Sequence, residues 1–166
     1  MIRIHEKTLN DLEFFTVLQQ ISEHAITALG KEAVLSVLPI EQEAQLLHEL
    51  DYTNEYLSSF DNDNRIPNHG FETIAKELKL LQIENTYLEV SSLQRLVSIS
   101  LTANTILKFL KKYTGYYPKL HQQSQLIEVN TVIIEHVDNV VDRFGDIKDD
   151  ASPLLSVLRQ SINKLR

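Results

Sequence analysis

Cysteine and tryptophan are absent from the sequence, and only four glycines and four prolines occur among its 166 residues. Without cysteine the chain can form no disulfide, no thiolate zinc site and no cysteine nucleophile, which fits a reducing compartment. So few glycines and prolines exclude a many-turned β-sandwich or barrel and leave long uninterrupted stretches between them. Their scarcity therefore predicts an all-α fold, a multi-helix orthogonal bundle.

Long hydrophobic runs are also missing. No stretch approaches the roughly 18 apolar residues that suggest a membrane helix. Charged residues appear soon after the N-terminal methionine, at Arg3 and Glu6, before a signal-peptide core could form. We therefore expect a soluble, cytoplasmic protein with no membrane contact.

Basic residues are in the minority, since 16 lysines and arginines stand against 23 aspartates and glutamates, for a formal charge of −7. This balance excludes a protein whose whole surface wraps a polyanion, but it leaves room for a local basic patch. The hydrophobic share of 43% is that of a packed chain, and the length is typical of one domain. We therefore expect a single helical domain over residues 1–166.

Apolar residues recur three and four positions apart along most of the chain, which is the spacing of one helical face. The predicted helices cover about residues 9–25, 27–37, 41–59, 74–81, 91–110, 120–141 (as one helix or two) and 153–166. The β-branched run 129–134 also fits a strand. We favour a helix there, because the apolar residues around it keep to one helical face.

Three of these helices begin with recognisable capping residues. Thr27 fits the N-cap of the second helix, and Ser91 with Gln94 three residues later forms a capping box for the fifth. Ser152 followed by Pro153 marks the start of the last helix, since a proline at the first helical position loses no hydrogen bond.

The last helix carries an apolar stripe that no capping residue follows. The stripe consists of Leu155, Leu158, Ile162 and Leu165. Helices usually finish near a glycine, asparagine or proline, so we expect a longer helix cut at Arg166, with a natural frayed end as the alternative. A cut helix would leave the stripe exposed or facing a partner.

No nucleotide-binding or zinc motif is complete. Gly30-Lys31 lacks the glycine five positions earlier that a phosphate loop requires, and Glu32 replaces its Ser or Thr. No two of the six histidines stand in an HExxH-like frame. We therefore predict no cofactor-binding residue, and the motifs by themselves disclose no catalytic residue.

Two acidic stretches could hold a metal ion, but each has a simpler interpretation. Asp61, Asp63 and Glu72 occupy ligand positions of a calcium loop, yet Arg65 and Ile66 stand where a ligand and the turning glycine belong. The second stretch consists of Asp138, Asp142, Asp146, Asp149 and Asp150. It could serve a metal-dependent nuclease, although a solvated bend with acids before a helix N-terminus is favoured. We predict no metal site.

A local basic segment with aromatic residues interrupts the acidic background at residues 108–119. Its candidate nucleic-acid contacts are Lys108, Lys111, Lys112, Lys119, Tyr116 and Tyr117. Lysines can contact phosphates and tyrosines can stack on bases, which predicts weak, salt-sensitive binding without sequence preference. The alternative is a helix C-terminus whose lysines complement the dipole and whose tyrosines pack as loop covers, and we favour it.

Two stretches resemble the second MutS branch, the bacterial MutS homologues that lack mismatch-recognition domains. The matching residues near the N-terminus are Lys7-Thr8-Leu9, Leu12-Glu13-Phe14, Val17-Leu18, Ile21, Ala25, Thr27, Gly30-Lys31-Glu32 and Pro39. Those near the C-terminus are Gly145-Asp146-Ile147-Lys148-Asp149-Asp150-Ala151-Ser152-Pro153, Leu155, Leu158-Arg159 and Ile162. The order and separation of the two stretches are similar to the family, and the middle carries no diagnostic motif.

The resemblance implies the N-terminal core or lever base of a much larger ATPase, with the last helix beginning the long lever. It implies ATP and Mg²⁺ in the full-length protein, and in some members a nuclease tail, all outside this chain. It also implies a homodimer that acts on DNA in recombination and repair, or on stalled ribosomes, through clamp and ATPase domains. The role of these residues would then be to transmit movement between those domains. An independent helical interaction domain or adaptor is the alternative.

Overall fold

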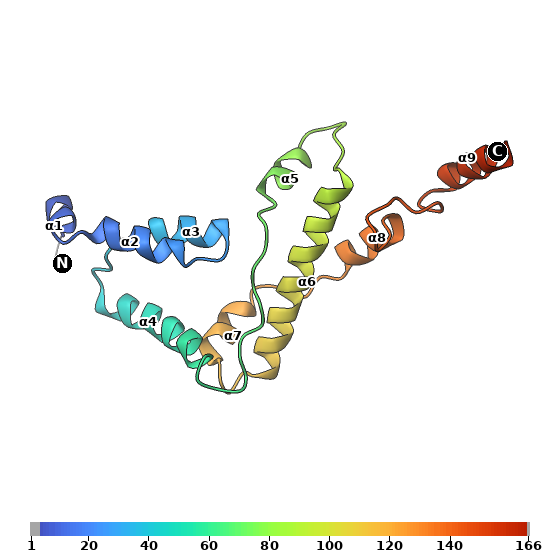
Figure 1. Ribbon diagram of the computed structural model, residues 1–166. Coiled ribbons are helices and arrows are strands. Elements are labelled where there is room, and N and C mark those ends of the chain that lie inside the picture. The colour runs from blue at the N-terminus through green and yellow to red at the C-terminus, as the bar shows by residue number, and fades with distance from the viewer. Residues whose placement is uncertain (1–3, 166) are drawn as a thin grey trace. The chain divides into compact units, whose positions relative to one another are not determined.

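The computed structural model describes residues 4–165, and its helices are joined by turns and loops (Figure 1). Its elements are α1 (Glu6–Asp11), α2 (Phe14–Glu23), α3 (Ala28–Leu35), α4 (Glu43–Ser58), α5 (Ala75–Leu80), α6 (Val90–Lys112), α7 (Pro118–Ser124), α8 (Val132–Val140) and α9 (Pro153–Lys164). Within the described range no strand forms, and one isolated antiparallel bridge joins Val141 to Ile147. The predicted all-α fold class is confirmed, while the orthogonal packing of the helices stays a prediction.

The chain divides into two compact units. Unit 1 holds the described residues up to Thr73 together with Thr105–Glu128, and unit 2 holds Ile74–Asn104 together with the described residues from Val129 onward. Helix α6 contributes residues to both units. That residues 1–166 form a single domain stays a prediction.

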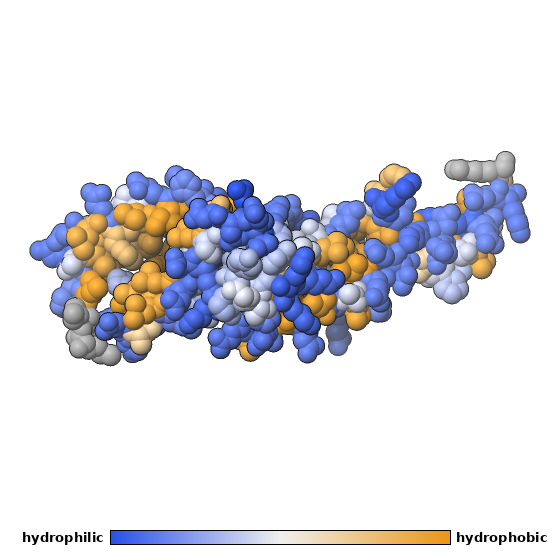
Figure 2. All heavy atoms as spheres, turned by 90° about the horizontal axis from the view of Figure 1, so that it is seen from below, coloured by the Kyte–Doolittle hydropathy of each residue, from blue (hydrophilic) through white to orange (hydrophobic). Residues whose placement is uncertain are grey.

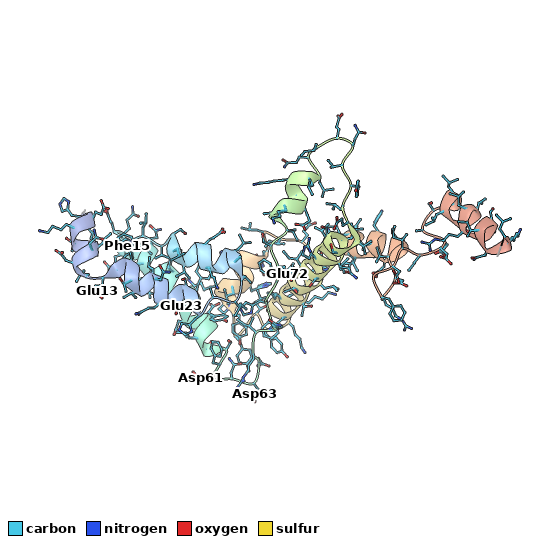
Figure 3. All side chains as sticks on the ribbon, turned by 45° about the horizontal axis from the view of Figure 1, so that its top comes forward. Glu13, Phe15, Glu23, Asp61, Asp63 and Glu72 are labelled. Atoms are coloured by element: carbon cyan, nitrogen blue, oxygen red, sulfur yellow. The ribbon has the colours of Figure 1, made fainter. Side chains whose placement is uncertain are left out.

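The first predicted helix, 9–25, is wrong as one element, because the structure divides it into α1 and α2. Glu13 separates them with a φ of 53°, in the left-handed region that interrupts a right-handed helix (Figure 3). The interruption also breaks the predicted stripe, since Leu12 is 70% exposed whereas Leu18 is buried. Helices α1, α2 and α3 then pack in sequence as neighbours in unit 1.

The predicted cap at Thr27 is confirmed. Its Oγ1 accepts a hydrogen bond of 2.9 Å from the backbone N–H of Gly30, which satisfies one of the free donors at the start of α3. A Cβ at Gly30 would lie 3.0 Å from that oxygen. Glycine at this position therefore gives the cap hydroxyl room and needs no nucleotide to explain it.

The predicted capping box at Ser91 is wrong, whereas the cap at Ser152 is confirmed. Helix α6 begins at Val90, so Ser91 lies within its first turn, and the carbonyl of Glu89 accepts the N–H groups of Ser92 and Leu93. At α9 the Ser152 hydroxyl accepts the N–H of Leu155 at 3.2 Å, ahead of a proline in the first turn.

The β-branched run near residue 130 becomes a helix from Val132 onward, as favoured. Among the described helices, none is both long enough and apolar enough to span a lipid bilayer.

Candidate functional site

The basic segment lies at the end of α6 and the start of α7, in unit 1. Lys108, Lys111 and Lys112 are all exposed on the last turns of α6, within an arc of about 100° around the helix axis. The Nζ of Lys112 lies 5.0 Å from the centre of the Tyr113 ring, a cation–π distance. Tyr116 is 57% exposed beside them. The structure therefore brings three of the four predicted lysines and one predicted tyrosine to the surface together.

Tyr117 is wrong as a candidate nucleic-acid contact, because its side chain is fully buried and its ring is not available to a base. A packed tyrosine is what the favoured alternative predicts. Its hydroxyl donates a hydrogen bond to the backbone carbonyl of Asn64 and lies 3.3 Å from the side-chain nitrogen of Asn62. Its ring centre lies 5.6 Å from that of Phe109. Tyr117 thus joins the loop after α4 to the end of α6. Although it lies in the basic segment, it is a core residue.

Lys119 is partly engaged by α4. Its Nζ lies 3.2 Å from a carboxylate oxygen of Asp51, and its backbone N–H donates to Glu55 at 2.8 Å. The other oxygen of Glu55 accepts the N–H of Leu120 at 2.9 Å. Glu55 therefore caps α7 from a helix 64 residues earlier, a role that no local sequence signal predicted.

The acidic loop residues of unit 1 do not converge as calcium ligands. Figure 3 shows Asp61 and Asp63 near the tip of the loop after α4, with Glu72 well away from them. The side chain of Asn62 accepts the backbone N–H of Asn64 at 2.7 Å, which shapes the turn without an ion. No group of three or more His, Cys, Asp or Glu side chains in the described part of the chain is arranged to hold a metal ion.

The second acidic stretch forms a tight hairpin in unit 2. The side chain of Asp142 accepts the N–H groups of Phe144 at 2.8 Å and Asp146 at 2.9 Å. These hydrogen bonds, that from Asp146 above all, hold the pKa of the Asp142 carboxyl below its usual range. Asp149 pairs with Arg159 of α9, and the Lys148 ammonium donates to the carbonyl of Asp138. Asp142 thus shapes the hairpin, Lys148 holds it to α8 and Asp149 holds it to α9.

Gly145 closes the hairpin in a left-handed backbone conformation that residues with a side chain rarely adopt. Its φ is +89°, and an added Cβ would lie 2.8 Å from the side-chain nitrogen of Gln94 on α6. The hairpin also lines an open hollow of about 530 Å³ with Asp138, Val141, Asp142, Arg143, Phe144 and Lys148. The Arg143 guanidinium lies 4.6 Å from the centre of the Phe144 ring, which is 75% exposed. The glycine that matched the family pattern thus has a local structural reason.

A further charged pair escaped sequence analysis. Glu77 of α5 is 3% exposed and accepts hydrogen bonds from the guanidinium of Arg95 on α6, one of them 3.0 Å from Nε. Arg95 also donates to the hydroxyl of Ser92 at 3.0 Å. The guanidinium bond lowers the pKa of Glu77 from its ordinary value. The partners stand 18 residues apart, so no helical spacing could have revealed them.

The predicted apolar stripe of α9 is exposed at three of its four residues, and its facing a partner stays a prediction. The exposed fractions are 51% for Leu158, 55% for Ile162 and 88% for Leu165, while Leu155 is half-buried. Leu154 and Val157 are 70% and 60% exposed on the same short helix. Within the described range, therefore, α9 offers apolar side chains that unit 2 does not bury.

Three endonucleases named MutS2 are similar to almost the whole chain. The protein from Symbiobacterium thermophilum is 25% identical over 161 residues, which cover 97% of this chain and 20% of that protein. Those from Geobacillus sp. and Lactiplantibacillus plantarum are 24% and 26% identical, and cover 96% and 97% of this chain. No protein-family model matches.

The chain is a MutS2-like region. It is a distant homologue that spans about a fifth of the length of the curated relatives it matches. The family resemblance carried by the N-terminal and hairpin residues is thereby confirmed. Thr27, Gly30 and Gly145, all within the matching stretches, cap a helix or close a turn in the structure. The MutS2-like pattern at these positions therefore reflects local folding requirements.

Proposed function

We propose that this region is a structural, force-transmitting part of a MutS-type ATPase, and that its own residues catalyse nothing. The distant homology over nearly the whole chain to part of MutS2 supports the proposal. ATP and Mg²⁺ would bind in other domains of a longer protein, which would act in the cytoplasm as a homodimer on DNA or on stalled ribosomes. This region would contact the clamp and ATPase domains of its own chain.

Helix α6 is the single observation that best supports transmission. It runs without interruption for 23 residues, about 35 Å, and contributes to both units, changing from unit 2 to unit 1 between Asn104 and Thr105. A continuous helix passes a displacement along its axis, because its hydrogen-bonded backbone resists compression. Glu77–Arg95 fixes one part of α6 to α5, and Tyr117 fixes the segment after α6 to the loop at Asn64.

The class of protein can be tested on the gene. We expect the reading frame to continue past Arg166 into a glycine-rich phosphate loop followed by Lys-Ser or Lys-Thr. A stop codon directly after Arg166 would contradict the ATPase proposal and favour the alternative, an independent helical interaction domain or adaptor. The exposed stripe of α9 is the observation that supports this alternative.

Transmission itself can be tested by interrupting α6 where it passes between the units. Ala103 is exposed, so Ala103→Pro breaks the helix without removing a packed side chain, at a cost of about 3 kcal/mol. In the full-length ATPase we expect basal ATP hydrolysis to persist and its response to nucleic acid to fall at least tenfold. Ala103→Ser is the matched control and should keep both. A full response in the proline variant would contradict the proposal.

As a second function of this region, we propose that the basic segment binds nucleic acid weakly. Lys108, Lys111 and Lys112 form no ion pair with a described residue, so their ammonium groups are available to phosphates. We expect Lys111→Ala/Lys112→Ala to lower single-stranded DNA affinity and to reduce the slope of log K against log salt by about 1.4, roughly 0.7 for each lysine, in fluorescence anisotropy. Lys76→Ala/Lys79→Ala on α5 is the matched control. Unchanged affinity in the first variant would reject the site.

A further inference from the structure

Helix α4 has two opposite faces, and among the described residues of unit 1 a helix packs against one of them. One face packs on α7 through the Glu55 carboxylate, with Tyr52 half-buried beside it. The other presents a row of leucines within an arc of about 100° around the axis. These are Leu46, Leu47, Leu50 and Leu57, with exposed fractions of 41%, 55%, 52% and 55%. We call this row the α4 leucine face.

Acidic residues border the α4 leucine face. Between Glu32 and Asn64 the sequence carries eight acidic residues and neither a lysine nor an arginine. On α4, Glu43 lies within the leucine face, and Glu49 and Asp51 lie along its two edges. Asp51 pairs with Lys119, whereas Glu43 and Glu49 form no ion pair with a described residue. The face therefore combines apolar area with unneutralised negative charge.

Figure 2 shows hydrophobic residues gathered, among hydrophilic ones, over the part of unit 1 that contains α1 to α4. An apolar patch with a polar rim is typical of an interaction site, and single exposed leucines are not. On a helix, leucines at this spacing match a second helix that lies alongside.

We propose that the α4 leucine face docks an amphipathic helix of a partner protein whose apolar stripe is flanked by lysine or arginine. Apolar side chains on that helix would cover the four leucines, and its basic residues would lie against Glu43 and Glu49. A second copy of the same face is disfavoured, because it would bring like charges together. The inference is independent of force transmission and goes beyond it.

The test uses the full chain and synthetic helical peptides of about 15 residues in fluorescence anisotropy. One peptide carries leucines at i, i+3, i+4 and i+7 with lysines along both edges. A second has the same composition in scrambled order, and a third has glutamates in place of the lysines. We expect micromolar binding of the first and at least tenfold weaker binding of the other two. Equal binding of the scrambled peptide would show charge attraction alone and overturn the proposal.

Variants of α4 identify the surface. Leu47→Ser/Leu50→Ser should weaken peptide binding at least tenfold, and Glu43→Gln/Glu49→Gln should weaken it a few-fold with a smaller salt dependence. Tyr87→Ser, at a residue 84% exposed in unit 2, is the control and should change nothing. The thermal midpoint of all variants should equal that of the parent chain.

Two outcomes would show a different occupant of the α4 leucine face and overturn the proposal. A lowered thermal midpoint in Leu47→Ser/Leu50→Ser would mean that the chain itself covers the leucines. Self-association of the parent chain in sedimentation velocity, lost in the same variant, would mean that a second copy does.

Discussion

Replacing Tyr117 by alanine is expected to destabilise unit 1 by about 3–5 kcal/mol, the range for removing a large buried aromatic side chain. The ring is fully buried beside Phe109, so its removal leaves a cavity between the end of α6 and the loop after α4. The loss also leaves the carbonyl of Asn64 without its hydroxyl donor. Urea unfolding followed by circular dichroism measures the change.

Two companion variants separate the ring from its hydroxyl. Tyr117→Phe keeps the packing and removes only the hydrogen bonds to Asn62 and Asn64, so we expect about 1–2 kcal/mol. Tyr116→Ala removes a neighbouring ring that is 57% exposed and should cost less than about 1 kcal/mol. Equal losses for Tyr116→Ala and Tyr117→Ala would contradict the core position of Tyr117.

Tyr117→Ala should also weaken the binding of nucleic acid by the basic segment. Lys108, Lys111 and Lys112 lie on turns of α6 that precede Tyr117, and the segment after α6 is held by Tyr117 and by the Glu55 cap of α7. Loss of the ring releases one of these two attachments. The lysines would then be presented from a less ordered helix end, which raises the entropy lost on binding a phosphate backbone.

Local signals predicted the fold well wherever the decisive contact lies within a few residues. The caps at Thr27 and Ser152 each bond a backbone N–H three residues later, so the sequence spacing itself specifies the contact. Ser91 has the same spacing to Gln94, but the carbonyl of Glu89 accepts the N–H groups of Ser92 and Leu93, so the helix begins before Ser91. Spacing identified a helix there and misplaced its first residue.

Distant contacts explain what sequence analysis missed at the candidate site. Tyr117 was a candidate nucleic-acid contact because it lies among lysines, and the favoured alternative, a packed tyrosine, named no partner for it. Its partners are 53 and 55 residues away. The Glu55 cap of α7 joins residues 64 apart. Because the burial of an aromatic residue depends on such distant segments, composition alone could not separate the buried Tyr117 from the exposed Tyr116.

Asn104 offers the second large effect, in unit 2. Its side-chain nitrogen donates to the carbonyl of Asn130 at 2.7 Å, and its side-chain oxygen accepts the N–H of Asn130 at 3.0 Å. Asn104 is 7% exposed, so the pair of hydrogen bonds fixes the segment before α8 to a buried position on α6. Asn130 in turn accepts the N–H of Val132 through its side chain and shapes the first turn of α8.

We expect Asn104→Ala to destabilise unit 2 by about 1–3 kcal/mol, because the backbone N–H and carbonyl of Asn130 both lose their hydrogen-bond partners. Asn130 is exposed, so hydrogen bonds to water replace only part of the lost free energy. Amide hydrogen exchange should show faster exchange at Asn130 and Val132. Asn104→Asp keeps the acceptor and loses the donor, so it should protect the Asn130 amide more than alanine does. Asn139→Ala, at an exposed position on α8, is the control. Unchanged exchange at Asn130 in Asn104→Ala would show that α8 is positioned without these hydrogen bonds, leaving the bond from Lys148 to the carbonyl of Asp138 to hold it.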